Sequence, residues 1–343
     1  MLLKRLTEAN GVSGNEHEVR EIIKNEIQSY VDEIKVDRLG NVIAIKHGKE
    51  GYPKIMLSAH MDEVGLMVNS IDDNGFIKFL TVGGIDDRIL ASNVVEIGKN
   101  KIKGIIGAKA IHLQSPDERK TPLKHKNLYI DIGAKSKEEA EKLVSRGDYI
   151  GYSSDYIEFG NDLIKAKALD DRAGCAIIMD LLKQSYDSTI FAVFSVQEEV
   201  GLRGAAPAAY ALNPHMAIVI ETTSCFDLEG IEEPNFVTRM SKGPALSILD
   251  TVTYYNKEIT QNIIDTAKKH NIPYQFKMIP KGGNDSGKIH LTREGIKTAA
   301  ISLPCRYLHS PVSVISKKDY SNCNLLLRNF LKNIKKGEFV YEY

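Results

Sequence analysis

Acidic and histidine side chains stand directly after the most apolar segments of this sequence. The segments KIMLSA, LIKAKAL, TIFAVFSVQ, MAIVI and TAAISLPCRYL have the pattern of buried strands. The residues that follow these segments and could bind a cation are His60, Asp170, Glu199, Glu221 and His309. Carboxylates combined with imidazoles are typical ligands of zinc, cobalt or manganese, whereas calcium prefers oxygen ligands alone. Because open α/β sheets bind ligands beyond the carboxyl ends of their strands, we expect a metal site there.

The charges of these residues predict two cations rather than one. Asp170, Glu199 and Glu221 supply three negative charges, and a bridging hydroxide supplies a fourth, which two divalent cations balance. Taken singly, the residues have ordinary explanations: Asp170 and Asp171 could cap a helix, and His60 could be a core histidine. Their recurrence at one predicted edge of the sheet favours the metal site.

Two further acids at the same edge are expected to assist the chemistry. Asp62 lies two residues after His60 on the same strand face, where it can accept the second imidazole N–H. Glu198 precedes the ligand Glu199 and can take a proton from a metal-bound water, which is the role of a general base.

The order of the predicted elements indicates an α/β fold with an insertion. Residues 1–67 and 164–343 alternate between strands and helices, which predicts a mostly parallel sheet with helices on both faces. Near the N-terminus, Ser13 and Glu16 have the spacing of a helix capping box. Residues 68–163 contain short β-like runs separated by Gly, Asp and Asn turns, which predicts a small all-β barrel or sandwich inserted into the α/β domain.

Composition excludes several classes of protein. The 343 residues contain 45 Lys and Arg and 45 Asp and Glu, and this balance argues against nucleic-acid binding and permits self-association. No apolar run approaches the roughly 18 residues of a membrane span, and no signal peptide is recognisable. The four cysteines show no paired spacing, so we expect buried free thiols and a cytoplasmic location.

Six stretches together resemble one known family. They are NGVSGNE (10–16), SAHMDEVGLMV (58–68), KALDDRAGC (167–175), VQEEVGLRGA (196–205), GGNDSGKIH (282–290) and YLHSP (307–311). In this order they are similar to the tetrahedral-assembly metallo-aminopeptidases, the glutamyl/deblocking aminopeptidase group of the co-catalytic zinc exopeptidases. The resemblance implies a zinc-exopeptidase-like fold, hydrolysis of N-terminal residues from short peptides, and two ions of zinc or cobalt, with manganese as an alternative.

The resemblance also implies a role for each site residue. Asp170 would bridge the two metals, one of which would also bind His60 and Glu221, and the other Glu199 and His309. Glu198 would be the general base, Asp62 would orient the histidine, and the Asp170–Asp171 peptide would be cis. The all-β insert at 68–163 would be a dimerisation domain, and the assembly would be a homododecamer built from dimers.

One position departs from the family and keeps other functions open. Family aminopeptidases usually carry aspartate where this chain has Glu221; in more distant relatives a glutamate there accompanies carboxypeptidase or deacylase activity. A deacylase of N-acyl amino acids is therefore an alternative, and an inactive scaffold protein is a more remote one. A glycosidase would need two carboxylates without metal, which the histidines disfavour. We expect Asp285 and His290 to line the site entrance, and Asp227 to be the replacement carboxylate if Glu221 is not a ligand.

Overall fold

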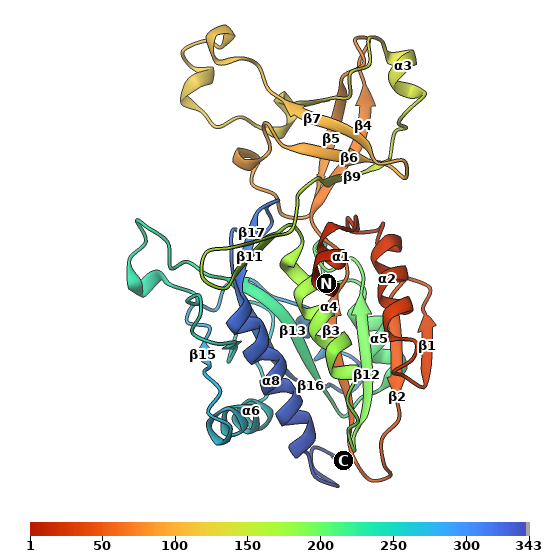
Figure 1. Ribbon diagram of the computed structural model, residues 1–343, viewed down its shortest axis with the longest axis vertical. Helices are drawn as coiled ribbons and strands as arrows, with labels where there is room; N and C mark the ends of the chain where they lie inside the picture. The colour runs from red at the N-terminus through yellow and green to blue at the C-terminus, as the bar shows by residue number, and fades with distance from the viewer. Residues whose placement is uncertain (341–343) are drawn as a thin grey trace.

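The computed structural model describes residues 1–340 and divides the chain into two bodies (Figure 1). The larger body contains a mixed sheet with helices packed against it, and the smaller is a barrel that projects from one edge. Within the described residues, no helix combines the length and the apolar character that crossing a membrane requires.

The large sheet has a parallel centre and antiparallel margins. Its main path runs β1 (Glu33–Val36), β2 (Val42–Lys46), β12 (Thr189–Ser195), β3 (Lys54–His60), β13 (Met216–Ser224), β16 (Lys297–Arg306), β17 (Ser313–Ser316), β11 (Leu163–Ala166) and β10 (Ile157–Phe159). Strands β12, β3, β13 and β16 are parallel. Two successive antiparallel pairings, β16 with β17 and β17 with β11, return β11 to the direction of these four. The short strands β14 (Ala245–Leu246) and β15 (Gln275–Phe276) extend the sheet beside β16.

Helices cover both faces of this sheet, as the alternation of elements predicts. One face packs against α1 (Leu2–Glu8), α2 (His17–Ile27), α4 (Leu169–Leu182), α6 (Lys257–Lys269) and α8 (Lys317–Asn333). The other face packs against α5 (Ala205–Leu212) and α7 (Ser286–Ile289). Along β3 the side chains alternate between the two cores, with Ile55 and Leu57 in the first and Met56 in the second. A strand buried on both faces must be almost wholly apolar, which explains the segment KIMLSA.

The smaller body is a closed barrel, which confirms the predicted small all-β insert. Its strands are β4 (Gly65–Ile71), β5 (Ile77–Val82), β8 (Tyr129–Asp131), β7 (Ile102–Gly107), β6 (Val94–Ile97) and β9 (Tyr149–Tyr152). Its interior has a separate apolar core, and α3 (Lys137–Glu141) lies beside β4. Between the barrel strands, single-turn 3-10 helices lie at Asp87–Ile89, Ile111–Leu113, Glu118–Lys120 and His125–Asn127. Another, at Glu233–Asn235, lies in the larger body between β13 and β14.

The strands of the barrel do not occupy the whole range 68–163. They begin at Gly65 and end at Tyr152, and β10 pairs with β11 at the margin of the large sheet. The run YIEFG resembles the other short β runs of the insert in composition. Because a short strand joins whichever sheet edge lies beside it, its own residues do not reveal its sheet.

Candidate metal centre

The five predicted ligands come together at the carboxyl edge of the parallel strands. His60 is the last residue of β3, His309 follows the end of β16, and Asp170 lies at the start of α4, just after β11. Glu199 follows β12, whose last residue, Ser195, is paired with His60. Glu221 lies inside β13 rather than after it, two residues beyond Val219, where the pairing of β13 with β3 ends. Its Oε1 lies 3.5 Å from Nε2 of His60, the last residue of β3.

The two carboxylate oxygens of Asp170 face two different groups of side chains. Oδ1 lies 3.3 Å from His60 Nε2, and that nitrogen lies 3.5 Å from Glu221 Oε1. Oδ2 lies 3.5 Å from His309 Nε2, and that nitrogen lies 3.2 Å from Glu199 Oε2. Asp170 therefore stands between a His60–Glu221 group and a His309–Glu199 group.

The electrostatic environment of the cluster favours the binding of positive charge. Burial, reinforced by the negative charge of Asp170, raises the pKa of Glu199 to about 8 and that of Glu221 to about 8. Burial acts against protonation of His309, but the nearby Asp170 and Glu199 carboxylates outweigh it and raise its pKa to about 9. Carboxylates buried this close together resist ionisation unless cations neutralise them, and the donor set therefore fits divalent metal ions.

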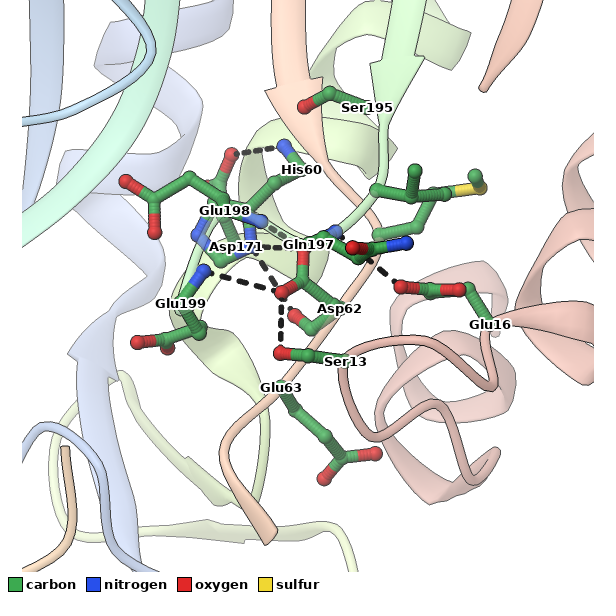
Figure 2. Close-up of polar contacts among 12 residues, drawn as sticks. Ser13, Glu16, His60, Asp62, Glu63, Asp171, Ser195, Gln197, Glu198 and Glu199 are labelled. Atoms are coloured by element: carbon green, nitrogen blue, oxygen red, sulfur yellow. Dashed lines mark hydrogen bonds and ion pairs between the residues drawn. The ribbon is translucent and has the colours of Figure 1, made fainter. Parts of the chain in front are cut away.

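Asp62 connects His60 to the loop that follows β12 (Figure 2). Its carboxylate accepts hydrogen bonds from the amides of Glu198 and Glu199 at 3.0 and 3.1 Å, and from Ser13 Oγ at 2.6 Å. His60 Nδ1 lies 3.4 Å from Asp62 Oδ1 and 3.1 Å from the Asp62 carbonyl. Burial opposes ionisation of Asp62, yet hydrogen bonds with His60 and Ser13 lower its pKa. Asp62 thus holds both an imidazole and the backbone of the Glu198–Glu199 pair.

Glu198 faces a cavity that opens beside the cluster. The cavity has a volume of about 600 Å³, and its wall includes His60, Asp170, Glu198, Glu199, Glu221 and His309. Burial, followed by the negative charges of Glu221 and Asp285, raises the pKa of Glu198 well above the ordinary value. A carboxylate held beside a cavity with a raised pKa suits proton transfer near neutral pH.

Ser13 and Glu16 make hydrogen bonds to residues of the site, a role that their spacing in the sequence does not indicate. The predicted capping box is wrong: α2 has no side-chain cap at its N-terminus. Ser13 instead donates to Asp62, and Glu16 Oε1 accepts hydrogen bonds from the amides of Gly14 at 2.6 Å and Gln197 at 3.2 Å. Three consecutive amides, those of residues 197–199, therefore donate to buried carboxylates.

Asp171 is a further acid at the centre. The peptide bond that joins it to Asp170 is cis, as the resemblance implies. Ligand atoms of His60, Asp171 and Glu221 lie within 4.8 Å of one another, so this trio could also surround an ion. The Asp171 carboxylate accepts hydrogen bonds from the amides of His60 at 3.3 Å and Gly174 at 3.0 Å. These bonds assign Asp171 to holding the end of β3 and the first turn of α4.

A buried ion-pair network anchors the N-terminal helix beside the site. Lys167 Nζ lies 2.7 Å from Glu63 Oε1, and Arg172 Nη2 lies 3.1 Å from the same oxygen. Both side chains also donate to the carbonyl of Ala9, and Arg172 donates to that of Leu6 in the last turn of α1. No signal in the local sequence distinguishes these buried charges from solvent-exposed ones.

The expectations for Asp285 and His290 are wrong. Asp285 is 1% exposed and accepts a hydrogen bond from Ser195 Oγ at 2.6 Å, beneath the site rather than at its entrance. His290 Nδ1 lies 2.7 Å from the carbonyl of Ser286, and neither residue lines the cavity. Asp227, the carboxylate predicted to replace Glu221 if Glu221 is not a ligand, is paired with Arg306 at 2.8 Å and does not line the cavity.

Comparison with known proteins agrees with this geometry. A family profile described as M42 glutamyl aminopeptidase matches residues 40–326, and a second, described as AMPT, matches residues 1–23. The chain belongs to the M42 glutamyl aminopeptidase family. It is therefore a metal-dependent aminopeptidase, as the six motifs predict.

Relatives and solved structures resemble the M42 chain over nearly all of its length. A putative aminopeptidase of Acetivibrio thermocellus is 44% identical over 95% of this chain and 96% of its own. The lysyl aminopeptidase of Pyrococcus furiosus is 33% identical over 99% and 98%. Aminopeptidase APDkam598 from Desulfurococcus kamchatkensis superimposes with a TM-score of 0.94 at 34% identity, covering 98% and 95% of the two chains. The Pyrococcus horikoshii TET1 peptidase, which can assemble into a tetrahedron or a large octahedral shell, gives 0.86 at 32% identity, covering 97% and 99%.

Proposed function

We propose that this M42 aminopeptidase removes N-terminal residues from short peptides at a centre of two divalent cations, zinc or cobalt, with manganese as an alternative. His60 and Glu221 would hold one ion, His309 and Glu199 the other, and Asp170 both. The observation that supports this assignment is the position of Asp170, whose two oxygens face the two groups separately.

The side chains of the site would have different roles in the reaction. Bound there, the two cations would supply Lewis-acid activation of water and of the peptide carbonyl. Glu198, beside the cavity, would accept the proton of the attacking water and donate it to the leaving amine. Asp62 would keep Glu198 in position, because it binds the amides of both Glu198 and Glu199.

The longer arm of Glu221 is accommodated within the strand. Its Oε1 accepts a hydrogen bond from the amide of the next residue, Thr222, at 2.9 Å while lying 3.5 Å from His60 Nε2. The side chain therefore folds back on its own strand instead of reaching further into the cavity. This conformation supports a ligand role equivalent to that of the aspartate usual in the family.

A peptide library tests the proposed activity. We expect the zinc- or cobalt-loaded protein to shorten free peptides from their N-termini and to leave N-acetylated copies intact, as mass spectrometry would show. A chelator should abolish the reaction and added metal should restore it. Removal of the acetyl group would instead support the deacylase alternative, and cleavage that persists after complete metal removal would contradict the proposal.

We also propose that the barrel is a dimerisation domain within a dodecamer built from dimers. Ile111 and Leu113 lie in the barrel's long connection and are 70% and 64% exposed, and Ile105 on β7 is 55% exposed. Exposed apolar groups of this kind are typical of association surfaces. The P. horikoshii TET1 peptidase, which can assemble into a tetrahedron or a large octahedral shell, supports the proposal.

Altering the barrel should change the size of the assembly. Replacing residues 65–152 with a short glycine-rich linker should reduce the particle to monomers in light scattering, because the proposed interface is lost. The paired substitutions Ile111→Lys and Leu113→Lys test the same surface in a chain that retains the barrel. An intact protein that is monomeric throughout the micromolar range would refute the proposed dimerisation.

We further propose a cytoplasmic location. All four cysteines are buried and free, which fits a reducing compartment.

A further inference from the structure

The two histidines of the candidate centre are held in different ways. His60 is the last residue of a buried strand, its side chain is 2% exposed, and its Nδ1 lies 3.1 Å from the carbonyl of Asp62 in the same segment. His309 lies in the short loop between β16 and β17, where its φ is +57° and its side chain is 38% exposed. Packing therefore fixes the imidazole of His60, whereas the orientation of His309 depends on its hydrogen bonds.

The group that orients His309 belongs to the barrel. His309 Nδ1 lies 2.8 Å from the carbonyl of Gly84, which follows β5 where this strand returns towards the larger body (Figure 1). Because a carbonyl can only accept a hydrogen bond, Nδ1 carries the proton, and Nε2 faces Asp170 and Glu199. An imidazole held at one nitrogen in this way presents the other nitrogen to a cation in a fixed direction.

The preceding residue, Gly83, packs the same loop against Glu199. Its φ is +82°, and a Cβ at this position would lie 2.8 Å from Val64 Cγ1 and 3.4 Å from Glu199 Cβ. The conformation and the close approach both require glycine. Tyr152 of β9 lines a small cavity of about 10 Å³ together with Glu199 and His309. The barrel therefore approaches both members of the His309–Glu199 group.

The His60–Glu221 group is held by the larger body. Among the described residues, every hydrogen-bond and ion-pair partner of His60 and Glu221 lies outside the barrel. Besides each other, these partners are Asp62, Asp170, Asp171, Cys175 and Thr222. The contacts with the barrel are thus confined to one half of the centre.

The loop that contains Gly84 is fixed at its other end inside the barrel. Asp86 accepts a hydrogen bond from the amide of Arg88 at 2.9 Å, and Asp87 Oδ1 lies 2.8 Å from His125 Nδ1. Leu90, a few residues further on, is fully buried in the barrel core. The barrel therefore sets the position of the carbonyl that His309 meets.

We propose that Gly83 and Gly84 are positioning residues through which the barrel sets the affinity of the His309–Glu199 cation site, and of that site alone. The inference rests on the proposed function, because it concerns one of the two cations of the same centre. Loss of the partner that orients a ligating histidine usually weakens metal binding by about 10- to 100-fold. The barrel would thereby have a role at the metal centre in addition to the proposed dimerisation.

Two glycine substitutions in the barrel test this role. Gly83→Ala places a methyl group against Val64 and so displaces the loop, whereas Gly133→Ala is the matched control. Gly133 has a φ of +79°, and a Cβ there would meet nothing within 4 Å, so both variants carry the same backbone strain. In titrations at buffered free zinc, we expect one ion to bind about 10- to 100-fold more weakly in Gly83→Ala and the other as in the wild type. Gly133→Ala should bind both ions normally.

A second substitution identifies the weakened ion. Glu221→Ala should leave the His309–Glu199 site as the tighter one, and adding Gly83→Ala to this variant should weaken the remaining ion by the same 10- to 100-fold. At saturating zinc, light scattering should give Gly83→Ala the particle size of the wild type, so that altered association is not the cause.

A variant that retains both glycines tests the anchoring of the loop. Asp87→Ala removes the partner of His125 and should weaken the same ion to a smaller extent. Asp117→Ala is its control, because Asp117 is an exposed barrel acid paired only with Lys120 among the described residues, and it should bind both ions normally. This pair keeps the inference testable if Gly83→Ala does not fold.

The outcomes separate the inference from the proposed function. Equal affinities of Gly83→Ala and Gly133→Ala for both ions, or equal weakening of both ions in Gly83→Ala, would overturn the positioning role. Crystals of the metal-free protein give an independent test: the imidazole of His309 should lose its hydrogen bond to Gly84 in Gly83→Ala, and an unchanged imidazole would overturn the inference. Fewer than two ions in the wild type would instead contradict the proposed two-ion centre.

Discussion

Replacing Glu198 with glutamine is expected to lower kcat by roughly 10²- to 10⁴-fold, the range that loss of a general base usually costs. The amide has nearly the shape of the carboxylate but cannot accept the proton of the attacking water. Because Asp62 binds the backbone amide of residue 198 and not its side chain, the surrounding loop should keep its conformation. The metal content should therefore be unchanged.

Steady-state kinetics and elemental analysis of the same preparation check this prediction. Glu229→Gln is the matched control, because Glu229 is exposed and does not line the cavity, and its kcat should equal that of the wild type. Wild-type kcat in the Glu198→Gln protein would rule out the proposed role. A large loss accompanied by loss of metal would show that Glu198 acts as a ligand.

Replacing Asp170 with asparagine should remove both metal ions and with them all measurable hydrolysis. The two oxygens of Asp170 face the two groups of proposed ligands, so its charge contributes to the binding of both ions.

Glu221→Ala should weaken the binding of one ion only, because Glu221 lies beside His60 and is not paired with His309. Glu221→Asp should keep both ions and alter the rate, because the shorter arm shifts the carboxylate.

Metal stoichiometry measured at rising free zinc concentrations tests this pair of substitutions. We expect two ions per chain in the wild type, none in Asp170→Asn at low micromolar zinc, and one in Glu221→Ala. Thermal unfolding gives a second measurement, since an ion that binds only the folded state raises the melting temperature. Two tightly bound ions in Asp170→Asn would contradict the bridging role, and two in Glu221→Ala would show that Glu221 is not a ligand.

The candidate centre could be predicted because its residues lie at recognisable places in the chain. Each proposed ligand stands at or near the end of an apolar segment, and parallel strands bring such ends to one edge of a sheet. The side chain of His60 is an example: its strand is almost wholly apolar up to the histidine, and the structure places it beside Asp170 and Glu221. The alternation of strands and helices likewise predicted both covered faces of the sheet, and close turn spacing predicted the barrel.

The supporting contacts could not be predicted, because they join segments that are distant in the sequence. Ser13 and Glu16 have the spacing of a capping box, yet Ser13 donates to Asp62, 49 residues away, and Glu16 accepts from the amide of Gln197. Asp285 pairs with Ser195, and Lys277 faces a cavity built largely from other elements.

The sequence alone therefore determined the elements, the two bodies and the set of candidate cation ligands, because periodicity and strand ends are local properties of the chain. Only the tertiary structure decided which sheet β10 joins, which acids bind the backbone amides beside the centre, and which side chains line the cavity. The physical reason is that a polar side chain bonds to whatever groups folding brings within about 3 Å of it, and local spacing does not encode those neighbours.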